Sequence, residues 1–333
     1  MAPRSSAHRG LAAALCTIGA AIAAGDSKGG AGAPARIHMV TYTTGMYRDR
    51  FADSLKAKEA YARHWGYEFE VFDEVTLACG DFREVRWRGD QRYCKLDALE
   101  VMWHRIRELQ KSDPSRQDYL FWHDVDTHIM RPETPLQAFV EAGGAADVIF
   151  TDNALSLNNG VFFLKTSRTG RSFLRRWRDF CQSGEWPWAD NGCMYEFMLQ
   201  HLGGARYSGR CKEYSAAEFN PDQPELLTGT ELMRCFNDEM DALGMGCCGD
   251  VSRGVGHIRF LTGVQDAFNH HPCDQLEKDT SYSKAERGQI SANCWTEGMF
   301  LVHSKDVAYA QTSAQRVAAL AGEGGRTRLP DEL

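Results

Sequence analysis

The sequence predicts an α/β fold with a mostly parallel central sheet that has helices on both faces. The main observation is that short apolar or β-branched runs alternate with segments whose apolar residues recur at steps of three and four. Strands separated by helices in this way imply parallel pairing in a sheet covered on both sides. The second observation is the composition: 333 residues with 43% hydrophobic and 25% charged side chains are typical of an ordinary folded chain. Disorder and coiled coil are therefore not expected.

The first elements follow in order along the chain. Residues 37–43 (IHMVTYT) are an apolar and β-branched run, which predicts a strand. Residues 49–65 repeat apolar side chains at helical spacing, and Gly66 marks the end of that helix. Residues 67–72 (YEFEVF) alternate and predict a second strand. Residues 96–106 carry one apolar face of a helix that ends before Pro114.

Further elements continue the alternation. Apolar strands are expected at residues 119–122, 148–151, 160–164 and 299–302, and helices at 173–180 and 194–202. In such sheets, ligands bind beyond the carboxyl ends of the strands. The residues directly after each strand are therefore the candidates for function.

The two ends of the chain predict a route through the secretory pathway. Basic residues precede the apolar run 11–24, and Ala21 and Ala23 form an A-x-A cleavage pattern, so residues 1–24 are expected to be a signal peptide or a short signal anchor. A permanent membrane span is the weaker reading, because that run is shorter than the roughly 20 residues needed to cross a bilayer. Residues 25–35 are a glycine-rich linker, 36–322 are expected to be one domain, and 323–333 form a tail ending in Pro-Asp-Glu-Leu. That ending is similar to luminal retrieval signals, so we expect the lumen of the Golgi or endoplasmic reticulum, or secretion.

Charge and cysteine usage agree with that location. The formal net charge is −7 with no basic run, which excludes a nucleic-acid partner. Ten of the 11 cysteines follow the predicted signal peptide, an even number that fits disulfides. None of the ten forms a C-x-x-C pair, so structural zinc and thioredoxin-like chemistry are not supported. Six of them lie between Cys211 and Cys294, where we expect a loop-rich, disulfide-stapled C-terminal part.

The most informative stretch is DYLFWHDVDTHIM at residues 118–130. Its apolar strand runs directly into Asp124 and Asp126, and two hard oxygen ligands at a strand end suit Mn²⁺ or Mg²⁺. Two acidic residues in a plain solvent loop are the alternative reading. A haloacid-dehalogenase phosphatase would also place D-x-D after a strand, but it expects Thr or Val two residues past the second Asp, where this chain has His128.

Four blocks of the sequence resemble glycosyltransferase family 34, which includes fungal α-1,2-galactosyltransferases and plant xyloglucan α-1,6-xylosyltransferases. The blocks are YCKL at 93–96, WHDVDTHIM at 122–130, LNNGVFFLK at 157–165 and the Asp190-Asn191 pair before a helix. A last apolar strand ends at His303, as the closing motif of that family does. The resemblance implies a GT-A fold, which is Rossmann-like, with a nucleotide-sugar half at about 36–166 and an acceptor-side half at about 167–322.

The resemblance also implies roles for individual residues. The metal ligands would be Asp124, Asp126 and His303. Asp190 and Asn191 match the catalytic pair, although the family usually has Gln at the second position. The donor would be bound by residues from several strand ends: Thr41, Thr43, Lys95, Asp124, Asp126, Asn158, Asn159, Gly160 and Lys305.

Each of these roles has a plainer alternative. His303 is otherwise a lone histidine at a strand end, Lys95 a solvated lysine at a helix start, and Asn158 and Asn159 part of a turn. Lys305 lies two residues after the histidine, whereas the family lysine lies five after. Trp186 and Trp188 either stack against an acceptor sugar or anchor the core or a lid.

The function implied by the resemblance is a metal-dependent retaining glycosyltransferase. It would move a galactose or xylose from a UDP-sugar to a glycan or glycoprotein acceptor, with Mn²⁺ or Mg²⁺ as the ion. The alternative, from another class, is a secreted or luminal carbohydrate-binding protein that keeps the fold without catalysis.

Overall fold

The computed structural model describes residues 35–77, 79, 91–152, 157–183, 186, 189–207, 209, 211, 230–243, 253–255, 257–261, 272, 295, 297 and 299–323. These residues belong to a compact unit that begins at Ala35. The expected signal peptide, the linker up to residue 34 and the tail from residue 324 lie outside the described residues. None of the helices in the described ranges is long and apolar enough to span a bilayer.

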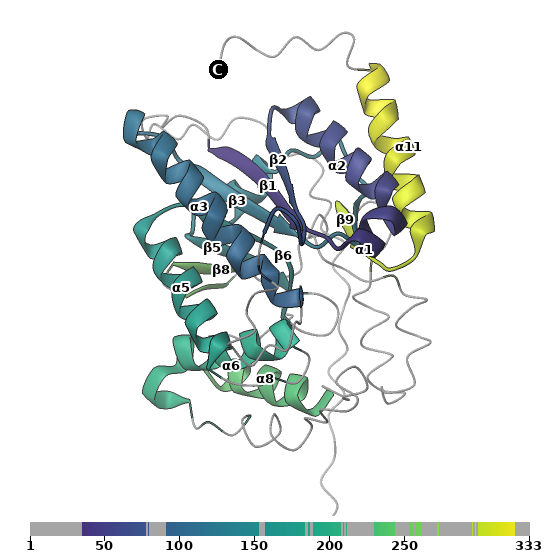
Figure 1. Cartoon of the computed structure of the whole chain (residues 1–333). Helices are drawn as coiled ribbons and strands as arrows, with labels where there is room; N and C mark the ends of the chain where they lie inside the picture. Colours follow the sequence, from purple (N-terminus) through teal and green to yellow (C-terminus); the bar gives the residue numbers. More distant parts are fainter. Residues whose placement is uncertain are drawn as a thin grey trace, which may run out of the picture. The chain divides into compact units, whose positions relative to one another are not determined.

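A seven-stranded sheet in the order β2-β1-β3-β6-β5-β8-β7 forms the centre of this unit (Figure 1). Its strands are β1 (Arg36–Tyr42), β2 (Glu68–Phe72), β3 (Asp118–His123), β5 (Val148–Asp152), β6 (Leu157–Lys165), β7 (Arg253–Val255) and β8 (Ile258–Leu261). Strand β1 is parallel to β2 and β3, and β5 is parallel to β8. Strand β6 is antiparallel to its neighbours β3 and β5, and β7 is antiparallel to β8. The mostly parallel sheet is thus confirmed, and reversed β6 starts beside the carboxyl end of β3.

A small second sheet joins distant parts of the chain. Strand β4 (Thr127–Ile129) follows β3 after a short turn and pairs antiparallel with β9 (Leu301–His303). Thr127 and His303 are partners in this register. The pairing therefore places the last strand next to the turn that follows β3.

Helices cover both faces of the central sheet (Figure 1). They are α1 (Gly45–Arg50), α2 (Ala52–Trp65), α3 (Cys94–Ser112), α4 (Gln137–Ala142), α5 (Arg168–Gln182), α6 (Ala189–Gly203), α8 (Thr230–Ala242) and α11 (Val307–Glu323), with short 3₁₀ turns η2 (Gln91–Tyr93) and η3 (Gly204–Arg206). Helices α3, α5, α6 and α8 contribute to one apolar core, while α2, α4 and α11 contribute to the other.

Strand β3 shows how one sequence serves both cores. Leu120 and Trp122 belong to the core under α3 and α5, whereas Tyr119 and Phe121 belong to the core under α2 and α11. Successive side chains of a strand point to opposite faces, so a strand buried on both sides must be apolar throughout. Each of these large side chains contributes roughly 1.5–3 kcal/mol when it is removed from water. This burial fixes β3 as the rigid centre of the fold.

Some elements differ from the sequence expectations. The single helix expected at 49–65 is two helices, α1 and α2, separated at Phe51, and α1 has Thr44 as its N-cap. Helices α4 and α11 and strand β8 were not predicted, because each is short or lacks a strong apolar stripe. Within the C-terminal stretch expected to be loop-rich, the described residues include helix α8 as well as short strands.

Three disulfides are formed among the described cysteines. They join Cys79 to Cys94, Cys181 to Cys193, and Cys211 to Cys235. The expectation of disulfides is thus confirmed for six cysteines. The other four cysteines that follow the expected signal peptide, Cys247, Cys248, Cys273 and Cys294, lie outside the described residues.

Candidate active site

The turn after β3 carries the two carboxylates that the sequence singled out. Strand β3 is buried along its whole length and ends directly before Asp124. The backbone N–H of Asp124 donates to the carbonyl oxygen of Gly160 at 2.7 Å, and the hydroxyl of Thr127 donates to the carbonyl oxygen of Asp124 at 2.7 Å. These bonds satisfy the backbone of a tight turn. Asp124 and Asp126 are consequently held at the carboxyl end of the central strand.

His303 reaches the same place through the β4–β9 pair. Its Nε2 lies 3.2 Å from Oδ1 of Asp126. The ligand atoms of Asp124, Asp126 and His303 all lie within 4.8 Å of one another. Two carboxylates and one imidazole are a donor set that suits Mn²⁺ or Mg²⁺, and they leave coordination positions for oxygens of a substrate. The sequence expectation that these three side chains come together is met by the geometry.

Gly160 leaves room for the three side chains to converge. A Cβ at this position would lie 2.6 Å from Cε1 of His303 and 3.0 Å from Oδ2 of Asp124. The other oxygen of Asp124, Oδ1, accepts from the indole N–H of Trp122 at 2.9 Å and lies 3.4 Å from Nζ of Lys95. Oδ2 of Asp124 and the ring of His303 therefore both lie close to Gly160, where a larger residue would displace them.

Lys95 connects this cluster to a third carboxylate. Its side chain is almost fully buried, and Nζ lies 2.6 Å from Oδ2 of Asp190 and 3.4 Å from Oδ1 of Asp124. Nζ also donates to Oδ1 of Asn159 at 2.6 Å. Burial works against the charged ammonium, but the two carboxylates outweigh it and raise the pKa of Lys95. One cation thus bridges the end of β3 and the first turn of α6.

The charged groups in the cluster shift one another's pKa values. Burial raises the pKa of Asp124, and the Lys95 ammonium only partly opposes that effect. Burial also acts on Asp126, but His303 outweighs it and holds the pKa of this carboxyl well below its usual 3.8. The same pair raises the pKa of His303 above 6.5, against the effect of burial. The two opposite shifts favour an ion pair between Asp126 and His303, whose Nε2 and Oδ1 atoms lie 3.2 Å apart.

A second buried lysine supports the main chain of this turn. Lys58 on α2 is fully buried, and Nζ donates to the carbonyl oxygens of Asp124 at 2.9 Å and Val125 at 3.1 Å. Burial lowers the pKa of Lys58 to about 7, although Asp126 and Asp124 oppose that shift. Its neighbour Ser54, also on α2, donates to the carbonyl oxygen of Thr127 at 2.9 Å. Side chains of α2 thus hold the turn through hydrogen bonds to the main-chain oxygens of the turn.

His128 completes this support. Its Nδ1 lies 3.0 Å from the hydroxyl of Ser54 and its Nε2 lies 2.9 Å from the carbonyl oxygen of Ser304. Burial lowers the pKa of His128 to about 4, so the ring is neutral at physiological pH. Sequence reasoning missed Ser54, Lys58 and His128 as contributors to the site. The available signal was a lysine on the apolar face of α2, between Ala57 and Tyr61.

No protein-family model matches this chain, and no curated protein matches it. Among solved structures, it is similar to a glycosyltransferase involved in the glycosylation of the major capsid of PBCV-1, with a TM-score of 0.41 and 10% identity over 84% of this chain and 98% of that chain. It is also similar to the galactosyltransferase LgtC in complex with donor and acceptor sugar analogs, with a TM-score of 0.33 and 13% identity over 89% of this chain and 98% of that chain. Similarity at this level does not establish a shared function, so the functional conclusion depends on the site itself.

The two asparagines of the LNNG segment have different surroundings. Asn158 is partly exposed, and its Oδ1 accepts from the backbone N–H of Gly160 at 2.7 Å. Asn159 is fully buried, and its amide donates to the carbonyl oxygen of Asp190 at 3.0 Å while accepting from Lys95. Its backbone N–H donates to Oδ1 of Asn191 at 3.1 Å. Asn159 and Asn191 therefore join β6 to α6 beside the cluster.

The remaining predicted donor residues are Thr41, Thr43 and Lys305. Thr41 is fully buried in β1, and Thr43 follows β1 with its hydroxyl donating to the carbonyl oxygen of Thr44 at 3.2 Å. Lys305 is exposed after β9, and its carbonyl oxygen accepts from Arg50 at 2.7 Å. The positive charge of Lys305 contributes to the low pKa of Asp126.

Trp186 has the surroundings of a core anchor. Its ring stacks on Phe180 with centroids 4.8 Å apart, and its indole N–H donates to the carbonyl oxygen of Cys181 at 3.1 Å. The structure thus favours the anchoring alternative for this residue. Trp188 lies outside the described residues.

Proposed function

We propose that the protein is a metal-dependent retaining glycosyltransferase that uses a UDP-sugar donor. The observation that carries the proposal is the joint placement of Asp124, Asp126 and His303 with the Lys95–Asp190 pair at the carboxyl end of β3. One cluster offers a ligand set for a divalent cation, and the other offers a carboxylate that a buried cation fixes in place. A nucleotide-sugar transferase needs both kinds of group.

The first need is to stabilise the leaving group. When bound, Mn²⁺ or Mg²⁺ would supply positive charge to the diphosphate that departs from the sugar. Asp124, Asp126 and His303 would hold that ion, and the positive charge of Lys305 also acts on Asp126. Lys95 is buried and contacts both Asp124 and Asp190, so its role is to fix these two carboxylates relative to one another.

The second need is to stabilise the sugar as it becomes cationic. Asp190 is buried, and a carboxylate beside a forming oxocarbenium ion lowers the energy of the transition state. In the reaction, the bond from the anomeric carbon to the diphosphate oxygen breaks, and a bond to the acceptor hydroxyl oxygen forms on the same face of the sugar. The hydroxyl proton passes to the departing UDP, so the products are UDP and the extended glycan.

The finer assignments complete the proposal. Similarity of motifs to glycosyltransferase family 34 supports galactose or xylose as the transferred sugar and Mn²⁺ as the ion. The disulfides and the apolar N-terminal run support the lumen of the secretory pathway, in the Golgi or endoplasmic reticulum, or secretion. The acceptor is a glycan or a glycoprotein.

A panel of UDP-sugars with Mn²⁺, read by released UDP, tests the activity. We expect slow hydrolysis with one donor and faster release when a glycan acceptor is added. Asp126→Asn should weaken metal-dependent UDP binding by roughly 100-fold or more, because it removes a ligand oxygen charge. Asp190→Asn should keep UDP binding and lower kcat by about 10²–10³-fold.

Asp53→Asn is the matched control, since Asp53 is a half-exposed carboxylate on α2 that pairs with Lys56 and not with the site. It should leave both measurements unchanged. A protein that binds glycans but releases no UDP from any donor would favour the non-catalytic carbohydrate-binding alternative. Equal effects of Asp53→Asn and Asp126→Asn on UDP binding would remove the metal assignment.

A further inference from the structure

Helix α5 carries a row of arginines that the proposed function does not use. The helix has five arginines and one aspartate, a formal charge of +4 within 15 residues, whereas the whole chain has −7. Four of the arginines recur at steps of three, four and three residues, and this spacing places them along one face of a helix. We call these four residues the basic stripe: Arg168, Arg171, Arg175 and Arg178.

The other face of α5 is apolar. It packs into the core that α5 shares with α3 and α6, through Phe173, Leu174, Trp177 and Cys181. Arg168 and Arg175 are exposed. The sequence of α5 thus separates a buried apolar face from a basic face in solvent.

Two arginines of the stripe have partners on α3. The guanidinium of Arg171 lies 4.5 Å from the ring centroid of Trp103. Arg178 pairs with Oδ1 of Asp97 at 2.9 Å and with Oε2 of Glu100 at 2.6 Å. These contacts hold α5 against α3, so packing between the two helices accounts for half of the stripe.

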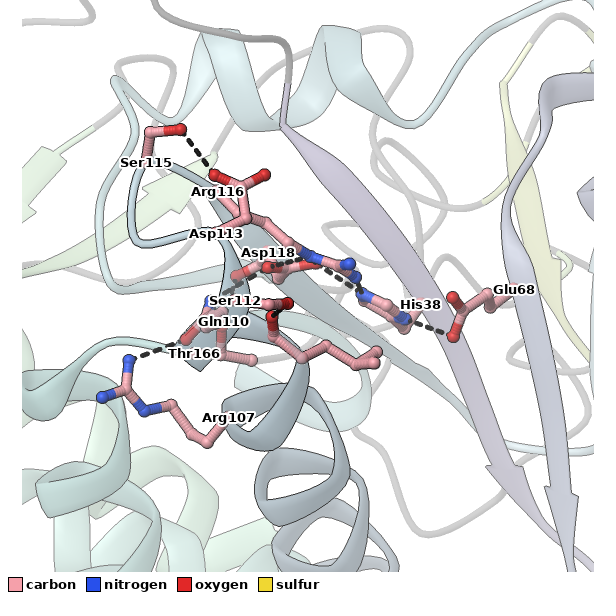
Figure 2. Close-up of polar contacts among 11 residues, drawn as sticks. His38, Glu68, Arg107, Gln110, Ser112, Asp113, Ser115, Arg116, Asp118 and Thr166 are labelled. Atoms are coloured by element: carbon pink, nitrogen blue, oxygen red, sulfur yellow. Dashed lines mark hydrogen bonds and ion pairs between the residues drawn. The ribbon is translucent and has the colours of Figure 1, made fainter.

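Arg107 extends the positive charge onto α3. Its guanidinium lies 5.6 Å from the centroid of the same Trp103 ring that Arg171 contacts. Its Nη1 donates to Oε1 of Gln110 at 2.7 Å (Figure 2), and Gln110 donates to the buried carboxylate of Asp118 at 2.9 Å. Guanidinium groups from two helices therefore lie against one indole ring, next to the exposed face of α5.

Arg168 and Arg175 are not explained by packing or by helix electrostatics. Neither side chain forms an ion pair with another of the described residues. Arg168 is the first residue of α5, where the helix dipole is positive and where no acidic side chain is present in the first turn. Like charges three or four residues apart on one helix face also repel each other. The stripe therefore destabilises the free helix, and an anionic partner would offset that effect.

The form of the stripe indicates which kind of anion fits. Its arginines extend over about 15 Å of helix, so a chain with several separated charges matches it better than a single ion. Guanidinium groups bind carboxylate and tetrahedral oxyanion groups through paired N–H donors. A bilayer fits less well, because helices that lie on membranes also expose large apolar side chains. Among the described residues, the exposed large apolar side chains lie outside α5: Met46, Val75, Leu109 and Val307.

The last turn of α5 is joined to the element that carries Asp190. The disulfide between Cys181 and Cys193 connects α5 to α6, with the two Cα atoms 5.5 Å apart, and Asp190 lies in the first turn of α6. Arg178 lies one turn before Cys181. A linear anion bound along the stripe would therefore have one end near the candidate active site.

We propose that the basic stripe binds an acidic glycan, and that this glycan is the acceptor in the transfer reaction. The inference rests on the proposed function, which makes a glycan the second substrate. Arg168 and Arg175 contact carboxylate or sulfate groups of the glycan, while Arg171 and Arg178 keep α5 in place against α3. The stripe thus selects acceptors by charge, outside the cluster that holds the donor.

Binding of two probes to the full chain tests the surface, in EDTA and at constant ionic strength. One probe is a galacturonic acid hexasaccharide, which carries carboxylates, and the other is a heparin hexasaccharide, which also carries sulfates. We expect saturable binding that the Arg168→Gln, Arg175→Gln double variant weakens by about tenfold or more. The matched control is the Arg63→Gln, Arg105→Gln double variant, which removes the same charge from arginines that pair with Glu59 and Glu70.

Transfer from a UDP-sugar with Mn²⁺ to acidic and neutral acceptors of equal length connects the surface to the reaction. In the Arg168→Gln, Arg175→Gln variant, we expect KM for the acidic acceptor to rise about tenfold. The kcat value and the slow hydrolysis of the donor by water should stay unchanged, because neither arginine lies in the catalytic cluster. A loss of folded protein would instead lower hydrolysis as well.

Several outcomes overturn the proposal. They are the absence of saturable binding of both hexasaccharides, an equal loss in the control variant, and tighter binding of polyglutamate or of anionic lipid vesicles than of the hexasaccharides. Equal transfer to acidic and neutral acceptors would overturn the inference and leave the glycosyltransferase activity standing. Absence of UDP release from every donor would overturn the proposed function and with it the acceptor role, whereas binding in EDTA would still decide whether the stripe holds an acidic glycan.

Discussion

Nζ of Lys58 donates to the main-chain carbonyl oxygen of Asp124 at 2.9 Å, so a buried lysine holds the backbone of the turn that carries the candidate ligands. The same nitrogen also donates to the carbonyl oxygen of Val125. A main-chain contact of this kind sets where the carboxylates of Asp124 and Asp126 point, and it leaves their oxygens available. Lys58 is therefore expected to act on the site through geometry.

Lys58→Met should weaken metal-dependent UDP binding by about tenfold, comparable with the loss of an outer partner of a metal ligand. Methionine keeps most of the volume of the side chain but cannot donate to the two carbonyl oxygens. Binding of UDP at several Mn²⁺ concentrations, followed by calorimetry, measures the effect. Lys56→Met is the control, since Lys56 lies on the same helix with its side chain 76% exposed. Unchanged metal affinity in a folded Lys58→Met variant would contradict the positioning role.

Gly160→Ala should displace the ligands that converge above this glycine. The added Cβ would lie 2.6 Å from Cε1 of His303, and neither that ring nor the β-sheet backbone can move away without disturbing the β4–β9 pair. We expect Mn²⁺ affinity to fall about tenfold or more while the protein stays folded. Gly45→Ala is the matched control, because its Cβ would lie 3.6 Å from Oε1 of Glu74, an ordinary van der Waals contact. Equal Mn²⁺ affinity of the two variants would rule out this crowding.

The disulfide between Cys181 and Cys193 should stabilise the region that presents Asp190. It joins α5 to α6 across 12 residues and lies one turn beyond Asp190. Closing a loop of this length contributes roughly 3 kcal/mol to the free energy of unfolding. Denaturant unfolding of the Cys181→Ser, Cys193→Ser double variant should show a loss of that order. Alkylation of either cysteine in the native protein without reductant would show that the bond is not formed.

Acid should destabilise the protein through Asp118. Burial acts to raise the pKa of this carboxyl, but hydrogen bonds from His38, Gln110 and Arg116 outweigh burial and lower it below 3.8. A group with a lowered folded pKa contributes stability above its unfolded pKa and loses it as the pH falls through the folded value. The free energy of unfolding should therefore decrease below about pH 4.

Asp118→Asn should reduce that acid dependence and lower stability at neutral pH, because it removes a buried charge from its partners. Asp113→Asn is the control, since Asp113 lies in the neighbouring turn and accepts from the hydroxyl of Ser115. Urea unfolding between about pH 2 and pH 7 gives the comparison. If the free energy of unfolding falls equally with pH in the wild type and in Asp118→Asn, Asp118 is not the source of the acid sensitivity.

Five strands of the central sheet (β1, β2, β3, β5 and β6) and the two carboxylates could be predicted from local sequence alone. Strand β3 is an unbroken apolar run because both of its faces are buried, and Asp124 and Asp126 interrupt that run where the strand ends. His303 was placed only by a resemblance of motifs, since no local pattern indicates that β9 pairs with β4. The pairing depends on tertiary contacts between residues far apart in sequence.

Other parts of the site have no sequence signature of their own. Lys58 and Ser54 act on main-chain oxygens of the turn, and such contacts carry no motif. Asn158 and Asn159 were both expected to face a sugar, but adjacent residues of a strand point to opposite faces. Only Asn158 is partly exposed, whereas Asn159 is enclosed between Lys95 and Asp190.

The register of β4 with β9 links ligand binding to the folding of nearly the whole chain. The candidate ligands come from residue 124 and from residue 303, so an unfolded chain does not present them together. A cation that binds the native arrangement and not the unfolded chain must raise the free energy of unfolding as its concentration rises. Any fragment that stops before β9 would lack His303, and with it the strand that pairs with β4. Cation affinity is thus a measure of how completely the chain has folded.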